Sequence, residues 1–197
     1  WYRLGDAHFD QGQMEEAIQA YDEATRLDPN FTKAWNKKGD ALYNQGKYDE
    51  AIQAYDEVTR RNPKDADAWL NKGFAFSFLG KYDETVRACN LSIQAYDDDL
   101  RLNPEDDIIL MKKSISLKVK GIALNSQGKY DEAVQAYDEA LRLNPEDADA
   151  WRLKGSALDS QGKYDEAVQA YDEALRLNPE DASAWIFKGF SLFFMGK

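Results

Sequence analysis

Apolar and small residues recur along most of the chain at the three- and four-residue spacing of one helix face. Trp35, Gly39 and Leu42 lie on one such stripe and predict a first helix, helix A. Gly46 follows the last residue of the stripe, as a helix C-terminal glycine does. Gly39 lies inside the helix, where glycine is less favourable than alanine by about 1 kcal/mol. Since this cost returns in every copy of the pattern, we expect a neighbouring helix to approach closely at this glycine.

A second amphipathic stripe follows and predicts helix B. Acidic side chains at 49–50 lie in its first turn and arginines at 60–61 in its last, where the helix dipole favours each sign of charge. Tyr55 belongs to the stripe that we expect to be buried. The pair at 62–63, Asn-Pro, ends the helix because proline cannot continue it, and Asp65 helps to start the next helix A.

This pair of helices repeats with a 34-residue period along the chain. Two glycines in each copy account for all 12 glycines of the sequence, one inside helix A and one at its C-terminal end. Because one copy cannot bury its apolar face alone, consecutive copies must stack. The glycines inside helix A are Gly5, Gly39, Gly73, Gly121, Gly155 and Gly189, and those at its end are Gly12, Gly46, Gly80, Gly128, Gly162 and Gly196.

These positions resemble the signature of the tetratricopeptide repeat (TPR) family, which has Trp, Leu-Gly, Tyr, Ala, an aromatic residue, Ala and Pro in order. The resemblance implies an all-α, right-handed α-solenoid of stacked antiparallel helix–turn–helix repeats, forming a single array over residues 1–197. We expect repeats at about 1–31, 32–65, 66–106, 107–147 and 148–181, with half a repeat at 182–197. The fifth copy matches the signature at Trp151, Gly155, Leu158, Ala167, Tyr171, Ala174 and Pro179.

Two further features distinguish this array from a uniform one. Residues 130–145 and 164–179 are identical, which indicates either recent duplication or design. The period is also interrupted once, because the glycine spacing from Gly73 to Gly121 is 48 and the proline spacing on each side of Pro104 is 41. Seven residues are therefore added to the helix B of the third repeat and seven to the helix A of the fourth.

Seven residues make nearly two helical turns, so an insertion of that length keeps the buried stripes in phase. We predict one elongated antiparallel hairpin at about residues 83–126, longer than its neighbours by about 10 Å. A structureless insertion of 14 residues is the alternative, which the apolar run at 108–111 disfavours. Two interpretations of the extra length remain open: an arm that docks a partner or a second copy of the chain, and a length variant that the fold tolerates without a function.

Composition excludes several functional classes. The 25 Lys and Arg residues against 36 Asp and Glu residues give a net charge of −11, which disfavours nucleic acid and anionic membrane surfaces as partners. No apolar stretch approaches the length of about 20 residues that spans a bilayer. Cys89 is the single cysteine, so no intrachain disulfide forms and we expect a cytoplasmic location.

Catalytic chemistry has too few candidate residues. His8 is the single histidine, so no histidine pair exists to bind a metal ion. Cys89 occupies the position that tyrosine holds in the other helices B, where we expect it to be buried and inert. Every glycine belongs to the repeat, which leaves none for a phosphate-binding loop. We therefore expect no enzyme activity, no cofactor and no metal site.

In the TPR family, the concave face lined by helices A binds extended or helical peptides. One subgroup clamps the C-terminal carboxylate of heat-shock chaperones with Lys, Arg and Asn side chains. In the nearest register here, Asp40 would repel that carboxylate, so we do not expect chaperone-tail binding. The candidate groove residues are Asn36, Asp40, Asn71, Phe74, Phe78, Lys118, Ile122, Arg152 and Ser156.

Near the middle of the predicted groove, Phe74, Phe78 and Ile122 suggest an apolar anchor for a partner. Lys118 and Arg152 are expected close enough to meet an acidic side chain of the same partner. The alternative is that these aromatic residues only fill space at the widened junction between the third and fourth repeats.

The C-terminal segment 182–197 is a lone helix A and carries apolar residues where a terminal repeat normally has a polar cap. Its exposed face implies a longer array or docking onto another chain. We therefore keep three roles open: a scaffold that binds a protein or peptide, a module that forms homo-oligomers through this helix or the elongated hairpin, and the targeting region of a larger protein. The self-association candidates are Phe187, Phe190, Phe193 and Phe194.

Overall fold

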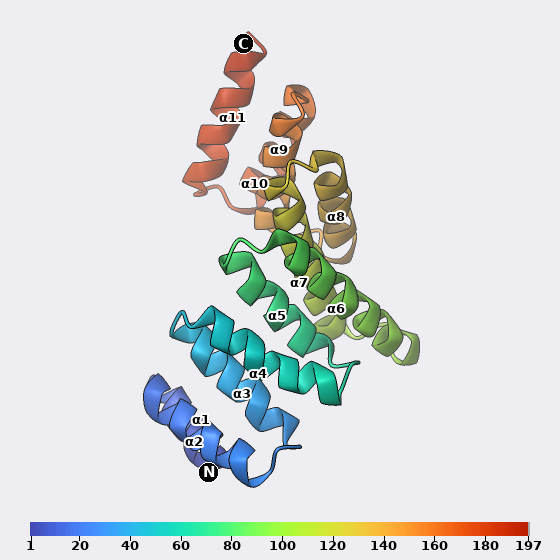
Figure 1. Cartoon of the computed structure of the whole chain (residues 1–197). Coiled ribbons are helices and arrows are strands. Elements are labelled where there is room, and N and C mark those ends of the chain that lie inside the picture. The colour runs from blue at the N-terminus through green and yellow to red at the C-terminus, as the bar shows by residue number, and fades with distance from the viewer. Residues whose placement is uncertain (197) are drawn as a thin grey trace. The chain divides into compact units, whose positions relative to one another are not determined.

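The computed structural model describes residues 1–196, which form eleven α-helices and no strand (Figure 1). This confirms the predicted all-α helical-repeat fold. The chain divides into two compact units, unit 1 at Trp1–Ala95 and unit 2 at Tyr96–Lys197. The helices are α1 (Tyr2–Asp10), α2 (Met14–Leu27), α3 (Thr32–Asn44), α4 (Tyr48–Arg61), α5 (Ala66–Phe78), α6 (Tyr82–Leu102), α7 (Asp107–Ser126), α8 (Tyr130–Leu143), α9 (Ala148–Ser160), α10 (Tyr164–Leu177) and α11 (Ala182–Phe194).

In the five helices A that are followed by a helix B (α1, α3, α5, α7 and α9), the internal glycine lies against a buried side chain of that helix B. A Cβ atom added at Gly155 would lie 2.6 Å from a ring carbon of Tyr171, and one at Gly121 would lie 2.6 Å from a ring carbon of Tyr137. Both rings are fully buried. The close approach predicted from the recurring glycine is therefore confirmed, and the tyrosine ring is the group that requires it.

Cys89 takes the place of this tyrosine in the third repeat. Its side chain is fully buried, and its Sγ would lie 3.1 Å from a Cβ at Gly73. The prediction of a small buried side chain at this position is confirmed.

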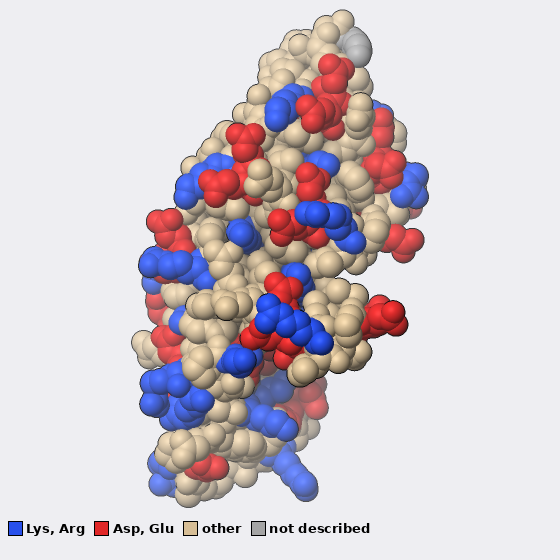
Figure 2. All heavy atoms as spheres, turned by 90° about the vertical axis from the view of Figure 1, so that its right-hand side faces the viewer, with Lys and Arg blue, Asp and Glu red and all other residues tan. Residues whose placement is uncertain are grey.

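Four helices A dock on the preceding helix B through one recurring set of contacts. The indole Nε1 of Trp35 donates a hydrogen bond to the Pro29 carbonyl at 3.0 Å. The Lys38 ammonium lies 5.1 Å from the centre of the Trp35 ring and pairs with Asp22 at 2.5 Å. Figure 2 shows Lys and Arg side chains next to Asp and Glu side chains over one face of the molecule. The other copies are Trp69 with Pro63, Lys72 and Asp56; Trp151 with Pro145, Lys154 and Asp138; and Trp185 with Pro179, Lys188 and Asp172.

Helix ends follow the sequence signals. Gly46 has a φ of +75°, a conformation that glycine adopts without strain, and it ends α3 one residue past the C-cap. The Asp65 carboxylate accepts a hydrogen bond from the backbone N–H of Ala68 at 3.0 Å and starts α5. The helix start predicted at Asp65 is therefore confirmed, and Asp106, Asp147 and Asp181 cap α7, α9 and α11 in the same way.

The interruption of the period is helical. Helix α6 has 21 residues where the other helices B have 14, and α7 has 20 where most helices A have 13. Both predicted seven-residue additions therefore continue the helices, and the structureless alternative is wrong. Within unit 2, the added part of α6 contacts α7 through an ion pair between Asp97 and Lys113 at 2.5 Å. Leu117, which replaces the repeat tryptophan, is 2% exposed and belongs to the core of unit 2.

Candidate peptide-binding face

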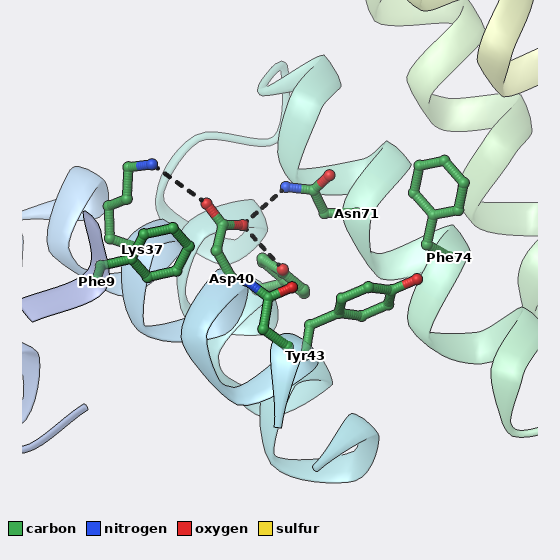
Figure 3. A pocket seen from close by; sticks show the side chains of 8 residues that line it. Phe9, Lys37, Asp40, Tyr43, Asn71 and Phe74 are labelled. Atoms are coloured by element: carbon green, nitrogen blue, oxygen red, sulfur yellow. Dashed lines mark hydrogen bonds and ion pairs between the residues drawn. The ribbon is translucent and has the colours of Figure 1, made fainter. Parts of the chain in front are cut away.

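In unit 1, helices α1, α3 and α5 line a pocket with a volume of about 280 Å³ (Figure 3). These are the helices A of three consecutive repeats, and α4 contributes the floor through one tyrosine. We call this cavity the Asp40 pocket. Its lining residues are Phe9, Lys37, Asp40, Tyr43, Asn44, Tyr55, Asn71 and Phe74.

Asp40 lies at the centre of the pocket and connects three helices. Its Oδ1 accepts hydrogen bonds from the Tyr55 hydroxyl at 3.0 Å and from the Asn71 side-chain amide at 3.2 Å. Its Oδ2 lies 3.6 Å from the Lys37 ammonium. The side chain of Asp40 is 28% exposed, so the carboxylate is accessible from the pocket while most of its surface is covered.

Burial raises the pKa of the Asp40 carboxyl above its ordinary value, because a charged carboxylate loses solvation in this position. The Tyr55 hydroxyl and the Lys37 ammonium favour the charged form and oppose this effect, and the carboxylate of Asp67 adds to it. The same burial raises the pKa of the Tyr55 phenol, so Tyr55 stays protonated and donates to Asp40.

Aromatic rings form the walls of the pocket. The Lys37 ammonium lies 5.3 Å from the centre of the Phe9 ring, within the range of a cation–π contact. On the other side, Tyr43 lies edge-on to Phe78, with ring centres 5.6 Å apart, and Phe78 stacks on Tyr48 at 5.0 Å. Phe78 is 62% exposed and therefore extends the aromatic surface beyond the pocket.

Of the five groove residues predicted on α3 and α5, three line the pocket, namely Asp40, Asn71 and Phe74, and Phe78 lies outside its lining. Asn36 does not line it either, and its Oδ1 is buried without a hydrogen-bond partner. Tyr55 is the residue that sequence reasoning assigned only to the core. A signal was present, because a tyrosine recurs at this position where phenylalanine would fill the same space, and its hydroxyl needs a polar partner.

In unit 2, both predicted groove cations already have acidic partners. Lys118 on α7 pairs with Asp147, the N-cap of α9, at 2.7 Å. Arg152 on α9 pairs with Asp149 at 2.8 Å and with Asp181, the N-cap of α11, at 3.2 Å. The spacing from each cation to its N-cap aspartate is 29 residues in both cases, so the repeat itself carries the signal for this pairing.

The other predicted groove positions of unit 2 are less constrained. Ile122 and Ser156 are each half-buried, and the backbone carbonyl of Ser156 accepts a hydrogen bond from the Ser160 hydroxyl at 3.0 Å. Helix α9 also carries a hydrogen-bonded carboxylate, Asp159. Asp159 accepts hydrogen bonds from Tyr171 at 2.8 Å and from Ser191 on α11 at 2.7 Å. The core tyrosine of this repeat therefore also bonds to an aspartate of helix A, but to one three residues later than the position of Asp40, which Ser156 occupies here.

Helix α11 exposes the apolar face that the sequence predicts. Phe190, Phe193 and Phe194 are 57%, 74% and 63% exposed, although Phe194 stacks on Tyr164 of the preceding repeat. Phe187 is 37% exposed and stacks on Tyr171. A Cβ at Gly189 would have no neighbour within 4 Å, because no tyrosine of a following helix B covers this position in the described chain.

Other kinds of site find no support in residues 1–196. In that range no three His, Cys, Asp or Glu side chains are grouped so that they could hold a metal ion. None of the described helices combines the length and apolar character that crossing a membrane requires.

Stacked helix pairs with a polar and aromatic pocket on the A-helix face define an all-α repeat protein of the solenoid class. The chain belongs to the tetratricopeptide repeat family. A family profile described as tetratricopeptide repeat matches residues 119–189, and one described as TPR repeat matches residues 5–46 and 39–80. TPR proteins generally mediate protein–protein interactions.

Solved structures share this fold at low sequence identity. The crystal structure of MamA is 23% identical, with 91% of each chain covered and a TM-score of 0.76. YrrB, described as a TPR protein with an unusual peptide-binding site, is 20% identical over 95% of this chain and 90% of its own, with a TM-score of 0.69. PilF of Pseudomonas aeruginosa is 16% identical over 99% of this chain and 82% of its own, with a TM-score of 0.78. No curated protein sequence matches the chain.

Proposed function

We propose that the chain binds a peptide segment of a partner protein through the face lined by its helices A. The observation that carries this proposal is the Asp40 pocket, which three consecutive helices A build together and which combines aromatic walls with a carboxylate. Binding sites for small groups are concave, largely apolar and supplied with a few placed polar groups. The description of YrrB, whose fold is similar, includes a peptide-binding site and supports the same kind of role.

Each unit offers different groups to such a peptide. Unit 1 offers the Asp40 pocket and the exposed ring of Phe78. Unit 2 offers the half-buried side chain of Ile122, together with Lys118 and Arg152. An acidic side chain of the peptide would share these cations with Asp147 and Asp181, so its contribution to affinity is smaller than that of a free cation.

The proposal is tested by selecting peptides from a displayed random library on the immobilised chain. Phe74→Ala combined with Ile122→Ala removes apolar surface from the face of each unit, and we expect it to abolish selection while circular dichroism shows unchanged helix content. Leu27→Ala combined with Leu102→Ala is the matched control, because these apolar side chains are 61% and 88% exposed and belong to helices B, one in each unit. If this double variant of Phe74 and Ile122, the groove variant, selects the same peptides as the wild type, binding at this face is excluded.

Self-association is a second candidate function, and the exposure of α11 favours it. Phe190 and Phe193 are 57% and 74% exposed on one helix, and an exposed apolar patch of this kind is typical of protein–protein interfaces. Light scattering after size exclusion tests it with Phe190→Ser combined with Phe193→Ser. A wild-type chain that stays monomeric at high concentration contradicts this function, and a concentration-dependent dimer that the variant abolishes supports it.

A further inference from the structure

The Asp40 pocket already holds a cation from its own chain. The Lys37 ammonium lies between the Phe9 ring, whose centre is 5.3 Å away, and the Asp40 Oδ2 at 3.6 Å. Figure 3 shows Lys37 reaching over Phe9 toward this carboxylate. An aromatic face and a carboxylate stabilise a positive charge placed between them by cation–π attraction and by charge pairing. The position of Lys37 therefore indicates that the part of the pocket between Phe9 and Asp40 favours a positively charged group.

The carboxylate of Asp40 is incompletely satisfied by these partners. Its Oδ1 accepts two hydrogen bonds, but the distance from its Oδ2 to Lys37 is longer than a hydrogen bond. Asp159 of unit 2 also accepts a hydrogen bond from a tyrosine, but it lies three residues later in its helix A, at the position that Tyr43 holds in α3. It differs from Asp40 because each of its oxygens accepts a hydrogen bond of 2.8 Å or less. Asp40 thus keeps acceptor capacity on the oxygen that faces Lys37, whereas the Asp159 carboxylate is engaged at both oxygens.

The charge of Asp40 is also poorly compensated. Burial raises the pKa of this carboxyl, and the nearby carboxylate of Asp67 raises it further, so Lys37 and Tyr55 together do not offset the loss of solvation. A further cation placed against Oδ2 would compensate the charge. Groups whose pKa is shifted by burial and by neighbouring charges are concentrated at functional sites.

The remaining walls suit the stem of a long side chain. Tyr43 and Phe74 lie on the side of Asp40 away from Phe9, as Figure 3 shows, and both line the cavity. A volume of about 280 Å³ holds about nine waters at about 30 Å³ each, which is room for one extended side chain with its charged head. Lysine and arginine bury an aliphatic stem along apolar surface while the head meets a charge.

We propose that the Asp40 pocket binds a lysine or arginine side chain of the partner peptide, with Asp40 as the anion, Phe9 as the cation–π face, and Tyr43 and Phe74 along the stem. The incoming head displaces the Lys37 ammonium, which then moves toward solvent. This inference rests on the proposed function and specifies its partner as a basic peptide. The net charge of −11 agrees with it, because an acidic protein attracts basic segments over several ångströms.

The direct test titrates the full chain with n-butylguanidinium, with n-butylammonium and with neutral n-butanol at constant ionic strength. Binding is followed by NMR at the side-chain amides of Asn44 and Asn71, which line the pocket. We expect the two cations, but not butanol, to shift these signals. Asp40→Asn should weaken cation binding by about tenfold or more, the effect of losing one charge-assisted hydrogen bond. Lys37→Met should strengthen it, because the competing ammonium is gone.

Asp159→Asn is the control, since it removes the charge of another helix A carboxylate that accepts from a tyrosine, in unit 2, and should leave cation binding at the Asn44 and Asn71 signals unchanged. Equal shifts with butanol, or unchanged cation affinity in Asp40→Asn, would overturn the proposal. Circular dichroism of each variant separates loss of binding from loss of folding.

The peptide library separates this inference from the proposed function. Peptides selected by the wild type should be enriched in Lys and Arg, and those selected by Asp40→Asn should lose this enrichment. If the wild type selects peptides without basic enrichment and the groove variant with Phe74→Ala and Ile122→Ala selects none, the cation pocket is wrong and peptide binding stands. If the groove variant selects as the wild type does, the proposed function fails, and the titration alone decides whether the cation pocket exists.

Discussion

Replacing the glycine inside helix A by alanine tests the packing rule of the fold, because the same substitution should have opposite effects at two equivalent positions. In Gly155→Ala, the new Cβ would meet three ring carbons of Tyr171 at 2.6, 2.8 and 2.9 Å. Tyr171 is fully buried and its hydroxyl is bonded to Asp159 at 2.8 Å, so the ring cannot move aside without losing that bond. Overpacking of this kind destabilises by about 1–3 kcal/mol, and three simultaneous contacts below 3.0 Å indicate the upper end.

Alanine also gains about 1 kcal/mol of helix propensity over glycine, so the net loss for Gly155→Ala is about 2 kcal/mol. Gly189→Ala is the matched control in α11, where no atom lies within 4 Å of the new Cβ, and it should be stabilising by up to about 1 kcal/mol. Gly73→Ala should lie between them, since its Cβ meets the smaller Cys89 Sγ at 3.1 Å.

Urea unfolding followed by circular dichroism gives the free energies for this series, and hydrogen exchange of the α10 amides reports the local effect at Tyr171. The reasoning is refuted if Gly155→Ala is as stable as the wild type, or if Gly189→Ala is destabilised to the same extent. Either outcome would mean that the tyrosine ring is not what requires glycine at this position.

Three further predictions concern charge and hydrogen bonding. Burial raises the pKa of the Asp40 carboxyl in the folded state. The protonated carboxyl therefore contributes its full stability below the unfolded-state pKa of about 3.9, and this contribution is lost as the pH rises through the raised folded-state pKa. Asp40→Asn should therefore become more stable relative to the wild type as the pH rises from acidic to neutral, as measured by urea unfolding. Asp181→Ala removes the N-cap of α11 and the partner of Arg152, and should lower the free energy of unfolding by about 1–2 kcal/mol, with the loss of exchange protection confined to α11. Trp69→Phe removes the hydrogen bond to the Pro63 carbonyl at 2.9 Å and should cost about 1 kcal/mol in the same assay, whereas an unchanged value would show that this bond adds nothing to repeat stacking.

The helices and their lengths were predictable from the sequence because they depend on local signals. Glycine at a positive φ, aspartate at the N-cap and proline after helix B each act within a few residues of their own position. The seven-residue additions were predictable for a related reason. The proline spacing around Pro104 located them, and the phase of the helix limited how they could be accommodated.

The Asp40 pocket was predictable only in part. The repeat register placed Asp40, Asn71 and Phe74 on one face, and these residues do line the cavity. It did not predict that the Tyr55 hydroxyl would reach Asp40 or that Lys37 would lie over Phe9, because both contacts depend on the direction of long side chains across two helices. Helical periodicity assigns a residue to a face, and the neighbouring helices then decide where its polar end lies.

The recurring contacts of tryptophan and lysine make the interfaces between repeats interchangeable. Trp151 and Trp185 bond to the carbonyls of Pro145 and Pro179, and their neighbouring lysines pair with equivalent aspartates on α8 and α10. Removing residues 148–181 would present α11 to α8 with the same donors, acceptors and charges that it now meets on α10. Whole helical hairpins can therefore be added or removed while the same contacts form between the remaining repeats. The number of repeats can thus change in evolution without altering the Asp40 pocket of unit 1.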